Sequence, residues 1–397
     1  MLALEGLKVL DLSRVLAGPW CTQTLADLGA DVWKVENPQG GDDTRSWMPP
    51  DINGESTYFL CCNRSKRSIA IDLRDPEGQR LVRELARRAD VVVENFRKGA
   101  LDRFGLGYDD LREINPRLIY CSISGYGRSG SRAEEAGYDF AIQAESGLMA
   151  ITGEVDGEPM KLGVAICDIV SGMNAVQAIL AALLAREKTG EGQFIDIALL
   201  DSAVNVLANV ASGYLATGKP PGRYGNAHAS IAPYQVFPAS DGSFAVAVGN
   251  DLQFRALCAK VINRPELADD PRFATAKTRA SRRAELAEIL SEIFRTKSKA
   301  YWVEALKAAG VPGGQIRTVP EVFAAPEAEE RGMFVEVDDA RHGKLKLPAP
   351  ALHLRGTPTR TPTAPPRLGE HTDAILAEVL GLDDEARDRL RMEGTVA

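Results

Sequence analysis

Histidine and cysteine are scarce in this chain, and their spacing excludes the common metal and disulfide frameworks. Only 4 of its 397 residues are histidines and 6 are cysteines. The cysteines form no CxxC pair, and no His or Cys group has the spacing of a zinc site. We therefore expect neither a disulfide scaffold nor a structural metal. Scattered free cysteines favour a cytoplasmic protein in a reducing compartment.

The chain also lacks a basic stripe and a long apolar run. Its formal net charge is −8, and no Lys/Arg block is present, so a nucleic-acid partner is not expected. The N-terminal residues resemble a strand entering a fold more than a signal peptide. The most apolar helical run, residues 175–185, is too short to cross a bilayer, so no membrane partner is expected either.

Several catalytic motifs are absent. The chain has no Walker A loop, no G-x-S-x-G elbow and no H-E-x-x-H helix. No motif therefore supports a serine hydrolase or a metalloprotease. Residues 125–130 match G-x-G-x-x-G and follow a predicted strand. No apolar helix follows them, so we interpret them as a glycine loop near the site and not as a nicotinamide or flavin fingerprint.

The first half of the chain alternates β-branched apolar runs with helical patterns. Strands are expected at residues 7–13, 31–36, 68–73, 90–96 and 118–125, with helices at 19–28 and 75–89. This alternation predicts βαβ units and a parallel sheet, hence an α/β fold. Such sheets bind ligands beyond the carboxyl ends of their strands. The loops to inspect are therefore those after Ser13, Glu36, Phe96 and Gly125.

The composition changes after a strand and helix predicted within residues 192–212. Residues 217–226 are rich in Gly and Pro and are typical of a linker. Beyond them we expect a hairpin at 234–248, turning at Asp241-Gly242, and helices at 251–261, 281–294 and 300–309. Residues 225–330 are thus a candidate small α+β domain. A Pro-rich stretch, 347–371, and a last helix, 372–379, follow.

Asp168 lies where an apolar stretch meets an Ala-rich helix. A carboxylate there is typical of a residue in the first turn of a helix or of a helix cap. The same position suits a nucleophile in apolar surroundings, with helix amides able to stabilise an oxyanion. Spacing alone leaves both interpretations open.

Two short polar and aromatic groups follow the predicted strand at 90–96. Asn95 and Phe96 end that strand at a ligand-facing position, although Phe96 equally suits the core. Arg103 and Phe104 follow, and Arg103 suits either a phosphate contact or a solvated helix face.

Many ordered stretches resemble the class III CoA-transferases, the family of formyl-CoA and carnitine-CoA transferases. They are RVLAGPW, LADLGADVWKVE, NRSKRSIAIDL, VVVENFRKGALDRFGLGYDDL, SISGYGRSG, GYDFAIQAESGLMAITG, VAICDIVSGMNAVQAILAAL and LGEHTDAIL. The resemblance covers essentially the whole chain. It implies a large Rossmann-like domain formed by residues 1–216 and completed by the return segment 331–397, and an interlocked, ring-like homodimer.

The resemblance also implies a mechanism in which Asp168 is the nucleophile. It would form an aspartyl anhydride and then an aspartyl-CoA thioester, with coenzyme A as substrate and product. No metal or redox cofactor is needed. The partners are an acyl-CoA and small carboxylic acids.

By the same resemblance, several residues match positions that contact CoA. They are Val15, Leu16, Lys66, Asn95, Phe96, Arg103 and Phe104. At Asn37 the formyl-CoA branch has an arginine, so that contact is altered here. The branch also carries a tetraglycine loop over the aspartate. Its nearest counterpart here is the segment ending at Asn250.

Tyr138 separates two activities within the family. The α-methylacyl-CoA racemases have a catalytic His where this chain has Tyr138. A phenol is a poor base for an α-proton at neutral pH, so transfer is favoured over racemisation, and Tyr138 is expected to hydrogen-bond near Asp168.

Within the family, the chain most resembles the succinyl-CoA:glutarate (hydroxymethylglutarate) transferase branch. The stretches are GDDTRSWMPP, GESTYFL, AHASIAPYQVF and VGNDLQF. A dicarboxylic acid needs a cation for its distal carboxylate. Arg45 and His228 are the candidates, with Arg223 in reserve, although each also suits a structural ion pair or loop hydrogen bond.

Three functions remain open from the sequence. They are CoA transfer through Asp168, isomerisation of a branched acyl-CoA, and nucleotide binding without catalysis.

Overall fold

The computed structural model describes residues 1–397, which form two compact units. The first contains Met1–Leu148, Lys161–Leu215 and Pro326–Ala397, and the second contains Met149–Met160 and Ala216–Ala325. The sequence analysis placed residues 149–160 in the N-terminal domain, whereas the structure places them in the second unit. The reason is local: the Arg223 guanidinium of that unit donates to the Glu154 carbonyl at 3.1 Å.

A six-stranded parallel sheet forms the centre of the first unit. Its strands are β1 (Lys8–Asp11), β2 (Asp31–Glu36), β5 (Arg67–Ala70), β6 (Val91–Glu94), β7 (Ile119–Ser124) and β8 (Phe194–Ala198). They lie in the order β5-β2-β1-β6-β7-β8, and every neighbouring pair is parallel. This is the 3-2-1-4-5-6 order of the Rossmann fold. The predicted α/β fold with a parallel sheet is confirmed.

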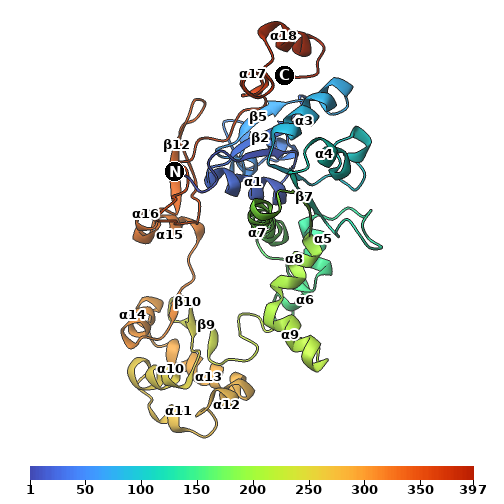
Figure 1. The fold of residues 1–397 in the computed structure, drawn as a ribbon. Coiled ribbons are helices and arrows are strands. Elements are labelled where there is room, and N and C mark those ends of the chain that lie inside the picture. Colours follow the sequence, from blue (N-terminus) through green and yellow to red (C-terminus); the bar gives the residue numbers. More distant parts are fainter. The chain divides into compact units, whose positions relative to one another are not determined.

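Helices cover both faces of this sheet (Figure 1). Successive strand residues point to opposite faces; Val9 packs into one core and Leu10 into the other. The first core is closed by α1 (Ala17–Asp27), α7 (Ile166–Thr189) and α8 (Leu199–Val206). The second is closed by α3 (Pro76–Arg88), α4 (Tyr108–Ile114), α17 (Thr372–Leu380) and α18 (Asp384–Met392).

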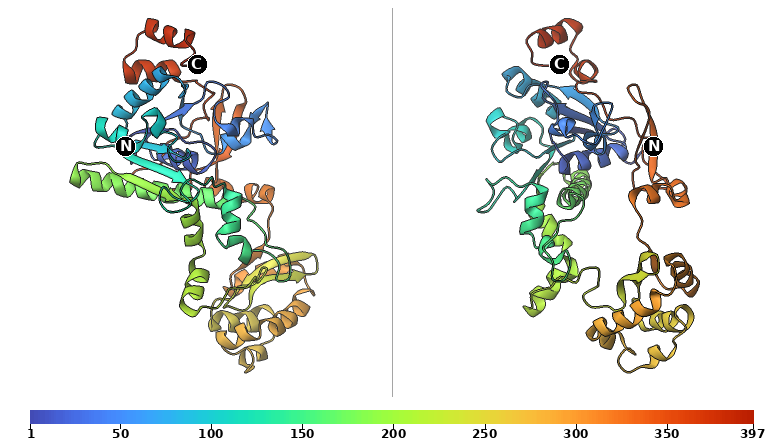
Figure 2. Two further views of the ribbon diagram at one scale, coloured as in Figure 1. Left: turned by 90° about the vertical axis from the view of Figure 1, so that its right-hand side faces the viewer. Right: turned by 180° about the vertical axis from the view of Figure 1, so that it is seen from behind.

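Helix α7 is the longest helix of the chain, and the left view of Figure 2 shows it from the side. Its 24 residues and a mean hydropathy of 1.6 would suffice to cross a membrane by length and composition. In the first unit it is a core helix packed against α1. A Cβ on Gly172 would lie 2.6 Å from the Ala17 carbonyl oxygen, so the close packing of these helices requires glycine there.

The C-terminal segment adds elements that the sequence analysis missed. Helix α18 follows the predicted last helix, and β12 (Phe334–Asp339) pairs with β13 (Gly343–Pro348). Helix α18 is rich in Asp and Arg and buries only Leu390, so it shows no clear apolar periodicity.

Short elements complete the first unit. They are η1 (Asp43–Ser46), β3 (Asp51–Ile52), β4 (Glu55–Ser56), α2 (Thr57–Leu60), η2 (Asp102–Phe104), α5 (Asp139–Glu145) and α16 (Pro326–Glu330). Two helices cross the boundary between the units: α6 (Leu148–Ile151) lies mostly in the second unit, and α9 (Ala208–Thr217) lies mostly in the first.

The second unit is a small α+β body with its own core. An antiparallel sheet contains β9 (Tyr234–Ala239), β10 (Gly242–Ala247) and β11 (Gly313–Gln315). The predicted hairpin is present, although its two unpaired residues are Ser240 and Asp241 and not Asp241 and Gly242. Its helices are α10 (Asp251–Ala256), the π-helical turn η3 (Leu257–Val261), α11 (Glu266–Asp269), α12 (Ala276–Ser281), α13 (Arg283–Phe294), α14 (Lys299–Ala309) and α15 (Val319–Phe323).

Four fully buried charged side chains connect β1 and β2 to the loops that follow them. The Lys66 ammonium donates to the Asp11 carboxylate at 3.0 Å, and the Lys34 ammonium donates to the Asp42 carboxylate at 2.9 Å. Burial alone would raise the pKa of Asp11, but the ammonium groups of Lys66 and Lys34 outweigh burial and lower it. We call Asp11, Lys34, Asp42 and Lys66 the buried charge network.

Replacing Lys66 with methionine is expected to lower the free energy of unfolding by about 3–5 kcal/mol, because Asp11 would remain buried without its cation. Denaturant unfolding of the purified variant measures this change. The exposed residue Lys188 gives the matched control, since Lys188→Met removes a solvated charge. Equal stability of Lys66→Met and wild type would show that the network does not stabilise the fold.

Candidate active site at the switch point of the sheet

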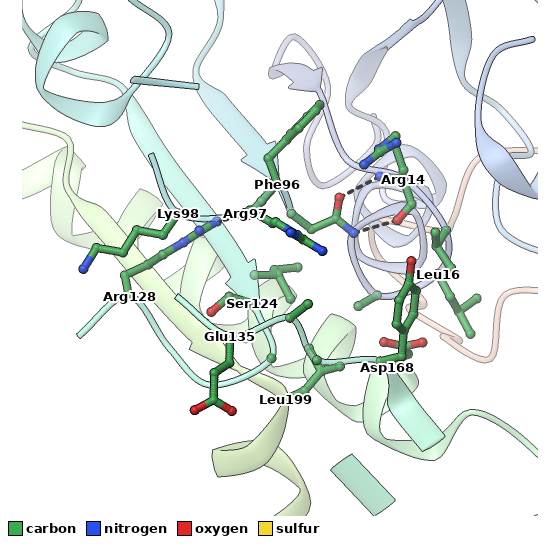
Figure 3. Close-up of a pocket in the computed structure, with 18 of the residues that line it drawn as sticks. Arg14, Leu16, Phe96, Arg97, Lys98, Ser124, Arg128, Glu135, Asp168 and Leu199 are labelled. Carbon is green, nitrogen blue, oxygen red and sulfur yellow. Dashed lines mark hydrogen bonds between the residues drawn. The ribbon is translucent and has the colours of Figure 1, made fainter. Parts of the chain in front are cut away.

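The strand order of the sheet reverses between β1 and β6, and a pocket lies at this point. Ligands of doubly wound sheets bind at such a reversal. The pocket, which we call the switch-point pocket, is lined by residues 14–17 after β1 and 95–98 after β6, together with Asp168 (Figure 3). The two loops are joined by the Asn95 side chain, which accepts from the Arg14 N–H at 2.8 Å and donates to its carbonyl at 2.6 Å.

The loop after β1 is held in an unusual backbone conformation. Val15 has a φ of 71°, a left-handed value that is strained for a β-branched residue. Its N–H donates to the Asp42 carboxylate at 3.2 Å. The Lys34 ammonium bonds the same carboxylate and also the Ser13 carbonyl, both at 2.9 Å. The buried charge network therefore fixes the shape of this side of the pocket.

The glycine loop after β7 forms another wall of the pocket. A Cβ on Gly125 would lie 2.6 Å from the Gly137 Cα, so the two ends of the loop meet backbone to backbone. Within the loop, Arg128 donates to Glu94 at 2.6 Å and to the Phe96 carbonyl at 2.8 Å. The loop is thereby fastened to the end of β6 and lines the pocket, as the sequence analysis expected.

Asp168 lies in the first turn of α7, but another residue caps this helix. The Asp139 carboxylate accepts from the Cys167 N–H at 2.8 Å and from the Asp168 N–H at 3.4 Å. Of the two structural interpretations, Asp168 as a first-turn helix residue is confirmed and Asp168 as the cap is wrong. Its carboxylate makes no hydrogen bond or ion pair within the chain.

The first amides of α7 are already in use. Besides the two that bond Asp139, the Ile166 N–H donates to the Val164 carbonyl at 2.9 Å and the Ile169 N–H to the Ala165 carbonyl at 3.1 Å. The expectation that these amides stabilise an oxyanion is therefore not met in this structure.

The environment of Asp168 disfavours its charged form. Burial, and secondly the negative charge of Asp139, raise the pKa of Asp168 to about 7. A carboxylate without hydrogen-bond donors is poorly stabilised as an anion and is correspondingly reactive as a nucleophile. A pKa raised this far, on a residue that lines a pocket, is typical of a residue with a role in function.

Asp139 is a functional residue that the sequence analysis missed. Its second oxygen accepts from the Gln143 amide at 2.7 Å, which fixes the carboxylate beside Asp168. Asp139 begins α5 in the sequence, and it caps a helix that starts more than twenty residues later. No local pattern reveals such a cap.

Cationic side chains gather on the side of the pocket away from Asp168. Figure 3 shows Arg97, Lys98 and Arg128 on one side and Asp168 with Leu16 on the other. The Arg97 side chain has no hydrogen-bond or ion-pair partner, and Lys98 lies 3.6 Å from the exposed Glu134. Such cations suit phosphate oxygens, and the sequence analysis did not single out Arg97 or Lys98.

Comparison with known proteins identifies the family. The family described as CoA-transferase family III matches residues 4–372. The chain belongs to CoA-transferase family III. It is an enzyme of the transferase class, and the resemblance noted from its motifs is confirmed.

Named relatives and a solved structure match nearly the whole chain. A succinate–glutarate CoA-transferase of Agrobacterium fabrum is 47% identical, covering 95% of both chains. A succinyl-CoA:glutarate CoA-transferase of Mus musculus is 46% identical, covering 100% of this chain and 91% of its own. The crystal structure of a CAIB/BAIF family protein from Brucella suis is 49% identical, with a TM-score of 0.84 over 95% of this chain and 99% of its own.

Most residues that match family CoA contacts line one of two adjoining pockets. Val15, Leu16, Asn95 and Phe96 line the switch-point pocket. Asn37, Phe96 and Phe104 line a neighbouring cavity of about 430 Å³, which we call the Glu36 pocket. Arg103 lines neither, and its guanidinium donates to the Gly99 carbonyl at 3.2 Å.

Lys66 lies elsewhere than the resemblance implied. Its side chain is fully buried, and its three ammonium hydrogens go to Asp11, the Pro19 carbonyl and Asn63 at 2.9–3.0 Å. In this structure Lys66 stabilises the fold and has no donor left for a nucleotide.

The proposed cations for a distal carboxylate are also engaged. Arg45 forms two 2.8 Å bonds with the Glu36 carboxylate and stacks on the Phe59 ring. Arg223 bonds backbone carbonyls of the second unit. Neither guanidinium is free for a substrate, which corrects the prediction for Arg45.

His228 and Asn250 belong to the second unit and have local roles there. His228 Nδ1 accepts from the Ser230 N–H at 3.0 Å. The Asn250 side chain caps α10 by accepting from the Gln253 N–H at 2.9 Å. The predicted substrate roles of these two residues stay predictions.

Tyr138 lines the switch-point pocket together with Asp168. Its side chain is 69% exposed. The residue precedes α5, so that it stands next to Asp139.

Replacing Asp139 with asparagine is expected to move the acid limb of kcat/KM to lower pH. The anionic nucleophile makes kcat/KM for acyl-CoA rise with pH through about 7 in wild type. Removing the negative charge of Asp139 lowers the pKa of Asp168 toward its usual value. Initial rates at acyl-CoA concentrations well below KM, taken across pH 5–9, roughly the range that brackets this limb, measure the shift in kcat/KM.

The control is Glu135→Gln, which removes a carboxylate that also lines the pocket but does not contribute to the shifted pKa. The acid limb of kcat/KM in Glu135→Gln should stay at the pH found for wild type. An unchanged limb in Asp139→Asn would contradict the assignment.

Proposed function

We propose that this family III enzyme transfers CoA from succinyl-CoA to glutarate or a closely related dicarboxylic acid, with Asp168 as nucleophile. The single observation that carries the proposal is the half-buried Asp168 carboxylate, which has no partner and a pKa raised to about 7 at the switch point. Succinate and glutarate are proposed because they appear in the names of relatives that are 46–47% identical to this chain.

The proposed reaction proceeds in balanced steps. Asp168 attacks the thioester carbonyl, which forms a mixed anhydride and releases the CoA thiolate. The thiolate attacks the Asp168 carbonyl, which gives an aspartyl-CoA thioester and free succinate. The acceptor carboxylate then attacks this thioester, releases the thiolate and forms a second anhydride. The thiolate attacks the acyl carbonyl of the acceptor, yielding its CoA thioester and the original carboxylate.

This scheme needs no metal or redox cofactor, because Asp168 is its only covalent group and each leaving group is a good one. The poorly solvated carboxylate favours attack, and the return of the same thiolate keeps water from the anhydride. Tyr138 lines the same pocket, and we propose that its hydroxyl hydrogen-bonds near the reacting carbonyl.

The two adjoining pockets suit the two ends of CoA. The Glu36 pocket presents Phe96 and Phe104, whose rings suit an adenine. Arg14, Arg97 and Lys98 supply positive charge for phosphates. The pantetheine arm would then run past Val15 and Leu16 to place the thioester at Asp168.

Racemisation is the second candidate from the sequence. It is less favoured because the residue at the position of the racemase histidine is Tyr138, which lines the pocket as a phenol.

We also propose that the enzyme acts as a cytoplasmic homodimer, interlocked as in the family it belongs to. Helix α9 supports an association, because its sequence ANVASGYLAT is apolar and none of its residues is buried within the chain. Tyr214 and Leu215 are 49% and 80% exposed. An apolar helix left uncovered in this way indicates a contact surface.

The activity test mixes the enzyme with succinyl-CoA and a panel of acids that includes glutarate, hydroxymethylglutarate, mesaconate, oxalate and formate. Mass spectrometry reads the new acyl-CoA species. We expect glutaryl-CoA or a close relative from wild type. The rate should fall by at least about 10³-fold in Asp168→Ala and Asp168→Asn, since both remove the nucleophile.

A parallel sample without acceptor should yield an Asp168-CoA adduct that hydroxylamine releases. Transfer by Asp168→Ala at the wild-type rate would overturn the mechanism. Deuterium uptake at the α-carbon of a 2-methylacyl-CoA, without transfer, would favour the racemase. Tight CoA binding with neither activity would indicate a binding module.

Light scattering is expected to give a mass of twice 42.8 kDa for the homodimer. Leu215→Glu places a charge on the exposed face of α9 and should lower the yield of dimer on refolding, because interlocked chains assemble as they fold and cannot separate while folded. A mass of 42.8 kDa for wild type at micromolar concentration would contradict the dimer.

A further inference from the structure

Asp168 separates two cavities in the first unit. The switch-point pocket lies on one side. A second cavity of about 520 Å³ shares Leu16, Tyr138 and Asp168 with it. We call the second cavity the Lys161 pocket, after the only Lys or Arg that lines it. The nucleophile thus borders two cavities, and of the residues assigned to CoA only Leu16 lines the second one.

The Lys161 pocket has mostly apolar walls and few charges. Its apolar lining includes Trp20, Val164 and Ile169. Tyr58 adds a hydroxyl near the nucleophile: burial, and secondly the Asp168 carboxylate, raise the pKa of Tyr58. A cavity with apolar walls and one convergent cation suits a short carbon chain that ends in an anion.

Lys161 has no carboxylate partner. Its ammonium donates only to the carbonyl of the next residue, Leu162, at 3.0 Å. Three of the four cations of the switch-point pocket do have a carboxylate partner, since Arg14 lies 3.2 Å from Asp43, Lys98 lies 3.6 Å from Glu134 and Arg128 lies 2.6 Å from Glu94, and only Arg97 is without one there. A cation facing a cavity without a counter-ion is available to a ligand anion.

The backbone that carries Lys161 is held in place. Gln143 accepts from the Leu162 N–H at 2.9 Å and donates to the Val164 carbonyl at 3.3 Å. The same Gln143 amide donates to Asp139 at 2.7 Å, and Asp139 caps the helix that begins beside Asp168. One side chain therefore joins the backbone beside Lys161 to the carboxylate that caps α7.

The charges of the pocket also change during the reaction. Asp139 is occupied by the amides of α7 and by Gln143. Once Asp168 carries CoA as a thioester, it has lost its negative charge. At that stage Lys161 is the lining cation that meets an incoming acid, and the carboxylate that remains in the lining, Asp139, is bound by the amides of α7 and by Gln143.

We propose that the Lys161 pocket is the acid subsite and that Lys161 binds the distal carboxylate of a dicarboxylic acid whose other carboxylate reacts at Asp168. This inference rests on the proposed function and assigns the selectivity for dicarboxylates to Lys161 instead of Arg45, whose guanidinium is bound to Glu36.

The test compares three acids at one donor concentration. They are glutarate, its half-amide glutaramate, and valerate, which lacks the distal group. We expect wild type to prefer glutarate. Lys161→Gln should lower the glutarate-to-glutaramate ratio of kcat/KM by about 10- to 100-fold, the usual effect of losing a charged hydrogen bond. Lys161→Arg should keep most of the preference. Use of the ratio cancels any effect on the donor.

Two variants serve as controls. Lys98→Gln, on the opposite side of Asp168, should weaken the binding of free CoA and leave the acid ratio unchanged. Lys161→Gln should leave the binding of free CoA unchanged and lower the acid ratio. Lys188→Gln lies about 30 Å along α7 from Asp168 by helical rise and should change neither.

Each outcome decides the proposal. An unchanged glutarate-to-glutaramate ratio in Lys161→Gln overturns it while CoA transfer stands. An equal loss with all three acids, or weaker binding of free CoA, also overturns it by showing that Lys161 is structural. If wild type transfers CoA to no acid, the proposed function fails and this inference fails with it.

Discussion

The shape of the site depends on charges that are buried beneath it. Val15 adopts a left-handed φ of 71°, a strain of about 1–3 kcal/mol for such a residue. Its N–H bond to Asp42 and the Lys34 bond to the Ser13 carbonyl hold that conformation. Because these groups are excluded from water, losing one leaves a buried charge unpaired. The loop that leads a ligand to Asp168 is therefore held to the sheet by buried hydrogen bonds.

The pKa of the proposed nucleophile, Asp168, is raised by burial, and its carboxylate receives no hydrogen bonds that would offset this. Asp139 takes the helix amides that would otherwise stabilise an anion on Asp168, and it adds a negative charge of its own. A folded state that disfavours the anion in this way gives up stability to keep the carboxylate reactive. Gln143 extends the arrangement, since it holds Asp139 and the Lys161 segment together.

Local pattern predicted the sheet well, because burial on both faces leaves near-continuous apolar runs. The strand at residues 31–36 matches β2 to the residue. Motif resemblance led to Asp168 and to Asn95. The sequence did not predict which side chains pair across loops or between distant segments. Lys66 meets Asp11 and Asp139 caps a distant helix, and even Arg45 and Glu36, which are 9 residues apart, meet across a loop. Each pairing is set by tertiary packing, which no single stretch of sequence encodes.

The contact between Gly125 and Gly137 has an evolutionary consequence. Residues 126–136 form a loop whose neck is closed by two backbones that leave no room for a side chain, in the manner of an Ω-loop. Several of these residues line the switch-point pocket. Substitutions or insertions within the loop can therefore remodel the rim of the pocket, while the closed neck shields Asp139 and Asp168 from the change. Ligand preference in this fold can diverge there independently of the chemistry.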